Sequence, residues 1–147
     1  MTTILLINGP NLNNLGNRDE SQYGSTTLDE INKELKEKSN KLNTKITSFQ
    51  SNHEGEIVDF IQKKSKSSDG VIINAGALSQ VGYSILDALL DSKLPYIEVH
   101  ISNIYSREIF RHKSVLSANA LGQICGLENF GYSYALDYLV KYLSKLK

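Results

Sequence analysis

The sequence has one cysteine, two prolines and no tryptophan in 147 residues. A lone Cys125 excludes an intrachain disulfide and a cysteine-rich zinc site. No apolar run approaches the ~18 residues that a membrane-spanning helix needs. The first residues lack the positive charge and the apolar stretch of a signal peptide, so we expect a cytoplasmic protein. No other residue cluster has metal-ligand spacing, and we predict no metal.

An excess of charge of either sign is also absent, because 16 Lys and Arg residues balance 16 Asp and Glu residues. Proteins that bind nucleic acid or a membrane surface usually carry a positive excess, so neither is an expected partner. Zero net charge gives little protection against self-association and mildly indicates an oligomer. The length and the 40% hydrophobic content fit one globular domain over residues 1–147.

The sequence does contain an alternation of short apolar segments and longer amphipathic ones. The short segments predict five strands, at residues 4–7, 45–49, 71–73, 96–100 and 123–125. The longer ones predict helices at residues 27–42, 54–66, 84–91 and 132–146, with a further short helix near 107–110. The first and third strands are continuously apolar, as in parallel strands buried on both faces. This pattern predicts a flavodoxin-like α/β fold, a three-layer sandwich with strand order 2-1-3-4-5.

Polar, turn-forming residues follow three of these strands, at residues 8–11, 74–80 and 98–103. Ligands of open α/β sheets bind at the carboxyl ends of the strands, so we expect the site there. The first of these segments lacks the Gly-Lys-Ser/Thr of a phosphate loop. It continues to Gly24 with no predicted helix, and a connection of this length is often a lid or a binding loop.

Tyr23 and Arg18 lie on this long connection. A nearby guanidinium stabilises a phenolate and would make Tyr23 a usable base, although the spacing alone also fits an ordinary surface tyrosine. Glu98 and His100 share one face of a strand, so the carboxylate could orient the imidazole. A hydrogen-bonded structural histidine fits that spacing equally well.

Arg107 and Arg111 are four residues apart and would share one face of a helix. Such a pair suits an anion or a hydroxyl-rich ligand, and a solvated basic surface is the alternative.

Together, these segments resemble the type II 3-dehydroquinate dehydratase family. The matching residues are 6–18, 23–24, 50–57, 72–76, 98–103, 107–108, 110–111, 114, 124–127 and 131–132. They follow the family's order over nearly the whole chain. The resemblance implies a lyase that removes water from 3-dehydroquinate through an enolate, without a cofactor, to give 3-dehydroshikimate. It also implies a homododecamer built as a tetramer of trimers.

The resemblance further implies roles for individual residues. Tyr23 would take the C2 proton beside the Arg18 cation. His100, oriented by Glu98, would protonate the departing C1 hydroxyl. Asn11 would help to hold the water that stabilises the enolate oxygen. Seven further residues would contact the substrate or complete the site. Asn74 would assist His100, the Ile101 backbone and the Ser102 hydroxyl would bind the carboxylate, and Arg111 would bind ring hydroxyls. Arg107 would be a lid partner, Gln80 would lie at the position of a ring-binding residue, and Asp87 would reach a neighbouring subunit's site.

One segment departs from the family, which usually has Thr-His-Thr-Ser where this chain has Ser79, Gln80, Val81 and Gly82. The family histidine binds ring hydroxyls, whereas Gln80 is neutral and reaches differently. We expect weaker substrate affinity with the chemistry retained. A Gly-rich stretch is likewise replaced at residues 128–129.

Two competing hypotheses remain open at this point. One is a non-catalytic flavodoxin-like binding module, such as a phospho-receiver or a flavin carrier. A receiver needs acidic residues after the first strand and an aspartate at the end of the third, where this chain has Asn8 and Asn74. The other is a family member with a changed substrate.

Overall fold

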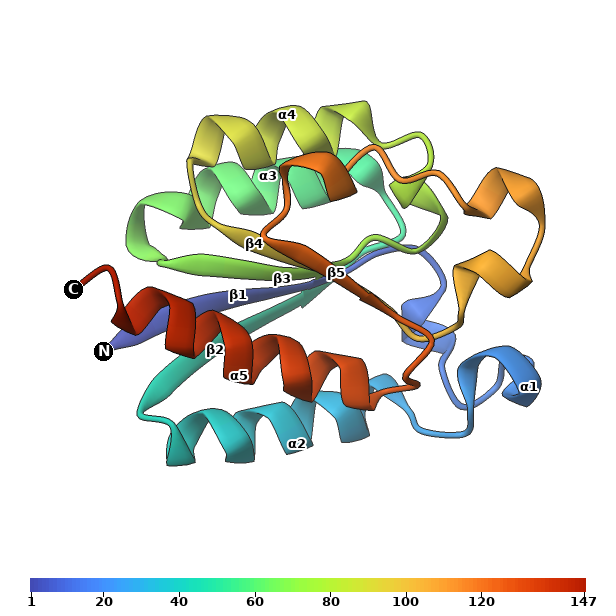
Figure 1. The fold of residues 1–147 in the computed structure, drawn as a ribbon, viewed down its shortest axis with the longest axis horizontal. Helices are drawn as coiled ribbons and strands as arrows, with labels where there is room; N and C mark the ends of the chain where they lie inside the picture. Colours follow the sequence, from blue (N-terminus) through green and yellow to red (C-terminus); the bar gives the residue numbers. More distant parts are fainter.

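The computed structural model describes residues 1–147 and contains one parallel five-stranded sheet between two helical layers (Figure 1). The strands are β1 (Thr2–Asn8), β2 (Thr44–Gln50), β3 (Gly70–Asn74), β4 (Tyr96–His100) and β5 (Gly122–Cys125). Their order is β2-β1-β3-β4-β5, and each neighbouring pair is parallel. The predicted flavodoxin-like class and strand order are confirmed.

Two long helices cover each face of the sheet (Figure 1). They are α2 (Leu28–Lys41) and α5 (Phe130–Ser144) on one face, and α3 (Glu54–Lys64) and α4 (Tyr83–Ser92) on the other. The helix α2 begins at a capping box, in which Thr27 accepts from the Glu30 backbone and Glu30 accepts from the Thr27 backbone. All four helices lie where the sequence predicts them.

Two connections differ from the sequence prediction. The connection after β1 is not free of helix before Gly24, because it contains a 3₁₀ turn at Leu12–Asn14 and the helix α1 (Glu20–Tyr23). Asp19 caps α1 by accepting from the Ser21 backbone. In place of one helix near 107–110, the structure has 3₁₀ turns at Ile104–Ser106 and Ile109–Arg111. Extended backbone at Arg107 and Glu108 separates these turns, and none of them is long enough to show helical periodicity.

The sheet separates two apolar cores. In β1, Ile4 and Leu6 face the core of α2 and α5, while Leu5 and Ile7 face the core of α3 and α4. The predicted burial of the first and third strands on both faces is confirmed, since residues 4–7 and 71–73 have no exposed surface. The strand β4 is buried throughout as well, including its two ionisable residues Glu98 and His100. Those two side chains must therefore find polar partners inside the protein.

The carboxyl ends of β1 and β3 are held together by a close backbone contact at Gly9. Its N–H donates to the Asn74 carbonyl at 2.8 Å. A Cβ atom at Gly9 would lie 2.4 Å from the Ala75 carbonyl oxygen, closer than any side chain can approach. Only glycine allows the two strand ends, and the loops that follow them, to meet at this distance.

We predict that Gly9→Ala destabilises the fold by about 1–3 kcal/mol, the usual cost of forcing an atom into packed surroundings. The measurement is urea denaturation followed by circular dichroism. Gly55→Ala is the matched control, because a Cβ at Gly55 in α3 meets nothing within 4 Å. Alanine is the better helix former, so the control should be unchanged or more stable by up to about 1 kcal/mol. Equal stability of the two variants would contradict the proposed steric role of Gly9.

Candidate active site

A cavity of about 490 Å³ opens at the carboxyl ends of β1, β3 and β4. Of the twelve residues singled out from the sequence, ten line it: Asn11, Arg18, Tyr23, Asn74, Gln80, His100, Ile101, Ser102, Arg107 and Arg111. Glu98 lies fully buried next to His100. Asp87 is exposed on α4 and does not line the cavity. The sheet thus brings together residues that are up to a hundred positions apart in the chain.

The phenol of Tyr23 lies between two arginines. The guanidinium carbon of Arg18 is 3.6 Å from the centre of the Tyr23 ring. Arg107 Nη1 donates to the Tyr23 hydroxyl at 2.8 Å and to Ser102 Oγ at 3.2 Å. Both contacts place positive charge beside the Tyr23 phenol. The Arg107 contact was missed from the sequence because it joins residues 84 positions apart.

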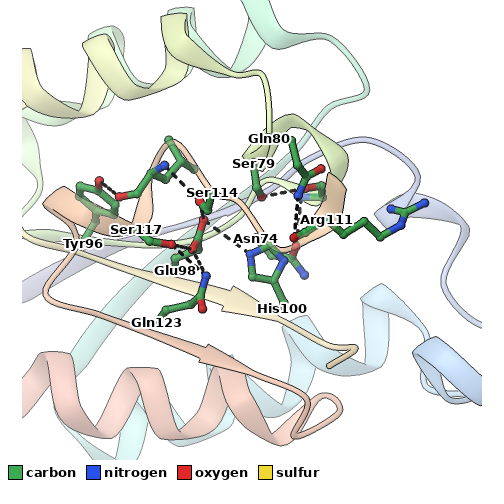
Figure 2. Close-up of polar contacts among 12 residues, drawn as sticks. Asn74, Ser79, Gln80, Tyr96, Glu98, His100, Arg111, Ser114, Ser117 and Gln123 are labelled. Carbon is green, nitrogen blue, oxygen red and sulfur yellow. Dashed lines mark hydrogen bonds and ion pairs between the residues drawn. The ribbon is translucent and has the colours of Figure 1, made fainter. Parts of the chain in front are cut away.

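The imidazole of His100 faces a buried carboxylate (Figure 2). His100 Nε2 lies 3.5 Å from Glu98 Oε1 and has no hydrogen-bond partner within the chain. The Glu98 carboxylate accepts from Ser114 Oγ, Ser117 Oγ and Gln123 Nε2. The sequence indicated the Glu98–His100 pair but no role for these three donors. Ser114 is among the residues that carry the family resemblance, but neither that match nor the polarity of the three side chains identifies a hydrogen-bond partner.

These contacts keep Glu98 ionised. Burial alone would raise the pKa of Glu98, but His100 and the hydroxyls of Ser114 and Ser117 outweigh it, so the pKa is lowered overall. The effect of the buried charge reaches Tyr96 on the same strand. Burial, with a smaller contribution from Glu98, raises the pKa of Tyr96 to about 12.

A second buried network holds Asn74. Its Nδ2 donates to the Tyr132 hydroxyl at 2.8 Å, and that hydroxyl donates to Asn8 Oδ1 at 2.6 Å. Asn74 Oδ1 accepts from the Gly76 backbone at 3.1 Å. The Asn74 amide is therefore held at both ends, and it makes no hydrogen bond to His100 in this structure. Tyr132 is fully buried, and burial raises the pKa of its phenol.

Gln80 and Arg111 also line the cavity, and Glu108 contacts Arg111 from outside its lining. Gln80 Nε2 donates to the Arg111 carbonyl at 3.5 Å, which is the limit for a hydrogen bond (Figure 2). Arg111 Nε donates to Glu108 Oε2 at 2.6 Å. The pKa of the exposed Glu108 carboxyl is lowered by a hydrogen bond from the Glu108 backbone and by the hydrogen bond from Arg111. These polar groups can bind the hydroxyl and carboxylate groups of a small ligand.

No three His, Cys, Asp or Glu side chains come close enough together to hold a metal ion. No helix has both the length and the apolar character needed to cross a membrane.

The fold and the cavity define a flavodoxin-like α/β protein with a polar site at its strand ends. The family model described as Dehydroquinase class II matches residues 2–140. A 3-dehydroquinate dehydratase of Prochlorococcus marinus (strain NATL1A) is 52% identical over 143 residues, covering 97% of this chain and 99% of that protein. One from Halothermothrix orenii is 48% identical over 145 residues, covering 99% and 98%. The chain belongs to the class II dehydroquinase family, as its sequence motifs indicate.

Solved structures agree with this assignment. The type II dehydroquinase from Butyrivibrio crossotus superposes with a TM-score of 0.91 at 44% identity, covering 94% of this chain and 97% of that one. A 3-dehydroquinate dehydratase-like protein from Bifidobacterium longum superposes with a TM-score of 0.72 at 28% identity, covering 98% and 99%.

We predict that Glu98→Gln lowers stability in a pH-dependent way. The folded-state pKa of Glu98 is lowered, so its carboxylate stabilises the fold above the unfolded pKa of about 4.3. This contribution is lost as the pH falls through the lower folded-state pKa. The difference in the free energy of unfolding between the original chain and the variant should therefore be largest near neutral pH and become smaller in acid.

Urea denaturation from about pH 7 to about pH 3 measures this difference. Glu37→Gln is the control, because Glu37 is exposed on α2. Its difference from the original chain should be small throughout. A Glu98→Gln difference that stays constant with pH would rule out the proposed linkage.

Proposed function

We propose that this chain is a lyase that eliminates water from 3-dehydroquinate to give 3-dehydroshikimate. The observation that carries the proposal is one cavity holding a phenol between two cations and an imidazole backed by a buried carboxylate. Elimination of water from a β-hydroxy ketone needs one base and one acid, and these groups provide both. Relatives named 3-dehydroquinate dehydratase support the choice of substrate. A non-catalytic binding module would have no need of this pairing.

The first step is removal of a proton next to the substrate ketone. The Tyr23 phenolate takes the proton from C2, the C2–H bond breaks, and its electron pair forms an enolate with the C3 carbonyl. Arg18 and Arg107 contact Tyr23 and place two positive charges beside the base. Asn11, in the cavity wall, helps to hold a water molecule that stabilises the enolate oxygen.

The second step is loss of the C1 hydroxyl. The enolate electrons form the C1–C2 double bond, the C1–O bond breaks, and His100 donates the proton that converts the leaving hydroxyl to water. Glu98 lies beside the imidazole during this transfer, since its Oε1 is 3.5 Å from Nε2. Transfer of the C2 proton from Tyr23 back to His100, directly or through solvent, restores both groups.

The remaining wall of the cavity holds the substrate. The Ile101 backbone and the Ser102 hydroxyl bind the carboxylate, and Arg111 binds ring hydroxyls. Asn74 assists His100 at the C1 hydroxyl, and Gln80 takes the place of the family histidine. Arg107 links these parts, because one nitrogen of its guanidinium contacts both Tyr23 and Ser102.

We also propose a homododecamer, a tetramer of trimers, in which Asp87 completes the cavity of a neighbouring subunit. Its exposure on α4 is compatible with this role. The assignment of residues 1–147 to one catalytic domain and the cytoplasmic location both stay predictions.

The function is tested with purified protein and 3-dehydroquinate, by following the ultraviolet absorbance of the conjugated enone product. We expect turnover by the original chain and turnover about a hundredfold to ten-thousandfold slower by Tyr23→Phe, because general-base catalysis is worth about 10²–10⁴-fold. Tyr134→Phe is the control, since Tyr134 is 52% exposed on α5, and should leave the rate unchanged. Absence of turnover, or turnover indifferent to Tyr23→Phe, would refute the proposal.

We predict that Gln80→His lowers KM by up to about tenfold with little change in kcat. A histidine would restore one hydrogen bond to a ring hydroxyl, worth about 0.5–1.5 kcal/mol. Little is lost from the fold, since the Gln80 bond to the Arg111 carbonyl is long. Val81→Thr, at an exposed neighbouring position outside the cavity wall, is the control and should not change KM. An unchanged KM in Gln80→His would contradict this prediction and show that Gln80 binds the substrate as tightly as a histidine would.

A further inference from the structure

Gln123 lies on the edge strand β5, directly opposite Glu98 in the register of β4 and β5. Its Nε2 donates to Glu98 Oε2 and also to Ser117 Oγ, at 2.9 Å from the latter (Figure 2). Its Oε1 accepts from the Tyr105 hydroxyl at 3.4 Å. Gln123 does not line the cavity, so it has no direct access to a bound substrate.

The two carboxylate oxygens of Glu98 have different partners. Oε1 accepts from Ser114 and faces His100, whereas Oε2 accepts from Ser117 and Gln123. The single hydroxyl proton of Ser117 is used by Glu98, and its oxygen accepts from Gln123. Every donor near the carboxylate therefore already has an acceptor, and the carboxylate plane is fixed with one oxygen toward the imidazole.

Gln123 is one of the two donors that fix the carboxylate plane on the Oε2 side. The terminal torsion of a glutamate is broad and is set by its hydrogen-bond partners. Without the Gln123 amide, Oε2 would keep only Ser117, and Ser117 would lose the donor that orients it. The ring of His100 would respond, because Nε2 has no hydrogen-bond partner and Glu98 is the charge beside it.

We propose that Gln123 is a positioning residue for the acid His100 and acts through Glu98; this rests on the function proposed above. Gln123 sets the carboxylate orientation, the carboxylate sets the imidazole orientation, and the imidazole delivers the proton to the C1 hydroxyl. The role belongs to the second step of the reaction. Formation of the enolate by Tyr23 does not depend on it.

The test replaces Gln123 with Leu, which keeps the side-chain size and removes the amide. We expect kcat about tenfold lower and KM within about twofold, because the cavity wall is untouched. The reaction in D₂O separates the two steps. When loss of the hydroxyl slows, more enolate returns to substrate through a Tyr23 phenol that has exchanged with solvent. Deuterium at C2 of the recovered substrate, relative to product formed, should therefore rise in Gln123→Leu.

Two comparisons make this test specific. Ile124→Val, on the other face of the same strand, packs against the core of α2 and α5 and should leave both kcat and the exchange ratio unchanged. In a Glu98→Gln background, adding Gln123→Leu should have no further effect, because residues that act through one shared group are not additive. Equal exchange ratios in Gln123→Leu and the original chain, or a full tenfold loss in the Glu98→Gln background, would overturn the proposal.

A readout that needs no turnover keeps this test separate from the proposed function. The imidazole signals of His100 in an NMR spectrum, assigned by their loss in His100→Asn, should shift in Gln123→Leu and not in Ile124→Val. If the original chain shows no turnover, the proposed reaction fails while this measurement still decides the positioning role. Unmoved His100 signals would refute the positioning role. Thermal unfolding of each variant confirms that the folded protein is being compared.

Discussion

The burial of one full negative charge on β4, next to the edge strand of the sheet, constrains much of this structure. Glu98 has no exposed surface, and an isolated buried carboxylate would cost several kcal/mol. Its donors come from the segment after β4 and from β5, so that segment must fold back over the strand and β5 must pair in one register. A slip of one residue would turn Gln123 to the other face. The register of the edge strand β5 therefore depends on the need of Glu98 for a hydrogen-bond donor.

The other half of the site depends on how closely the strand ends meet. Gly9 lets the end of β1 touch the segment after β3, and the long connection that follows β1 carries Arg18 and Tyr23 over the cavity. Arg107 reaches this connection from the turns after β4. The base therefore lies on a segment anchored by backbone contacts, whereas the acid lies at the end of the buried strand β4. Tyr23 and His100 line one cavity only because the connection after β1 and the end of β4 lie at the same edge of the sheet, where the strands have their carboxyl ends.

The accuracy of the sequence-based predictions follows from the range of the interactions involved. The apolar run at residues 4–7 and the capping box at Thr27 are local signals, and the elements they predict are present. The helix α1 was missed because its four residues are too few for periodicity and depend on the Asp19 cap. Arg107 and Arg111 were expected on one helix. They instead line the cavity from extended backbone and a 3₁₀ turn, so the right residues were found for the wrong geometric reason.

By itself, the sequence determined the alternation of strands and helices, the strand-end location of the site and the family motifs. These properties follow from local apolar periodicity and from residue types at fixed spacing. Only the tertiary structure decided which groups touch. The Arg107 contact with Tyr23, the three donors on Glu98 and the Asn74–Tyr132–Asn8 network join distant segments. A hydrogen bond requires both partners within about 3 Å, and sheet register and loop paths set that distance rather than position along the chain.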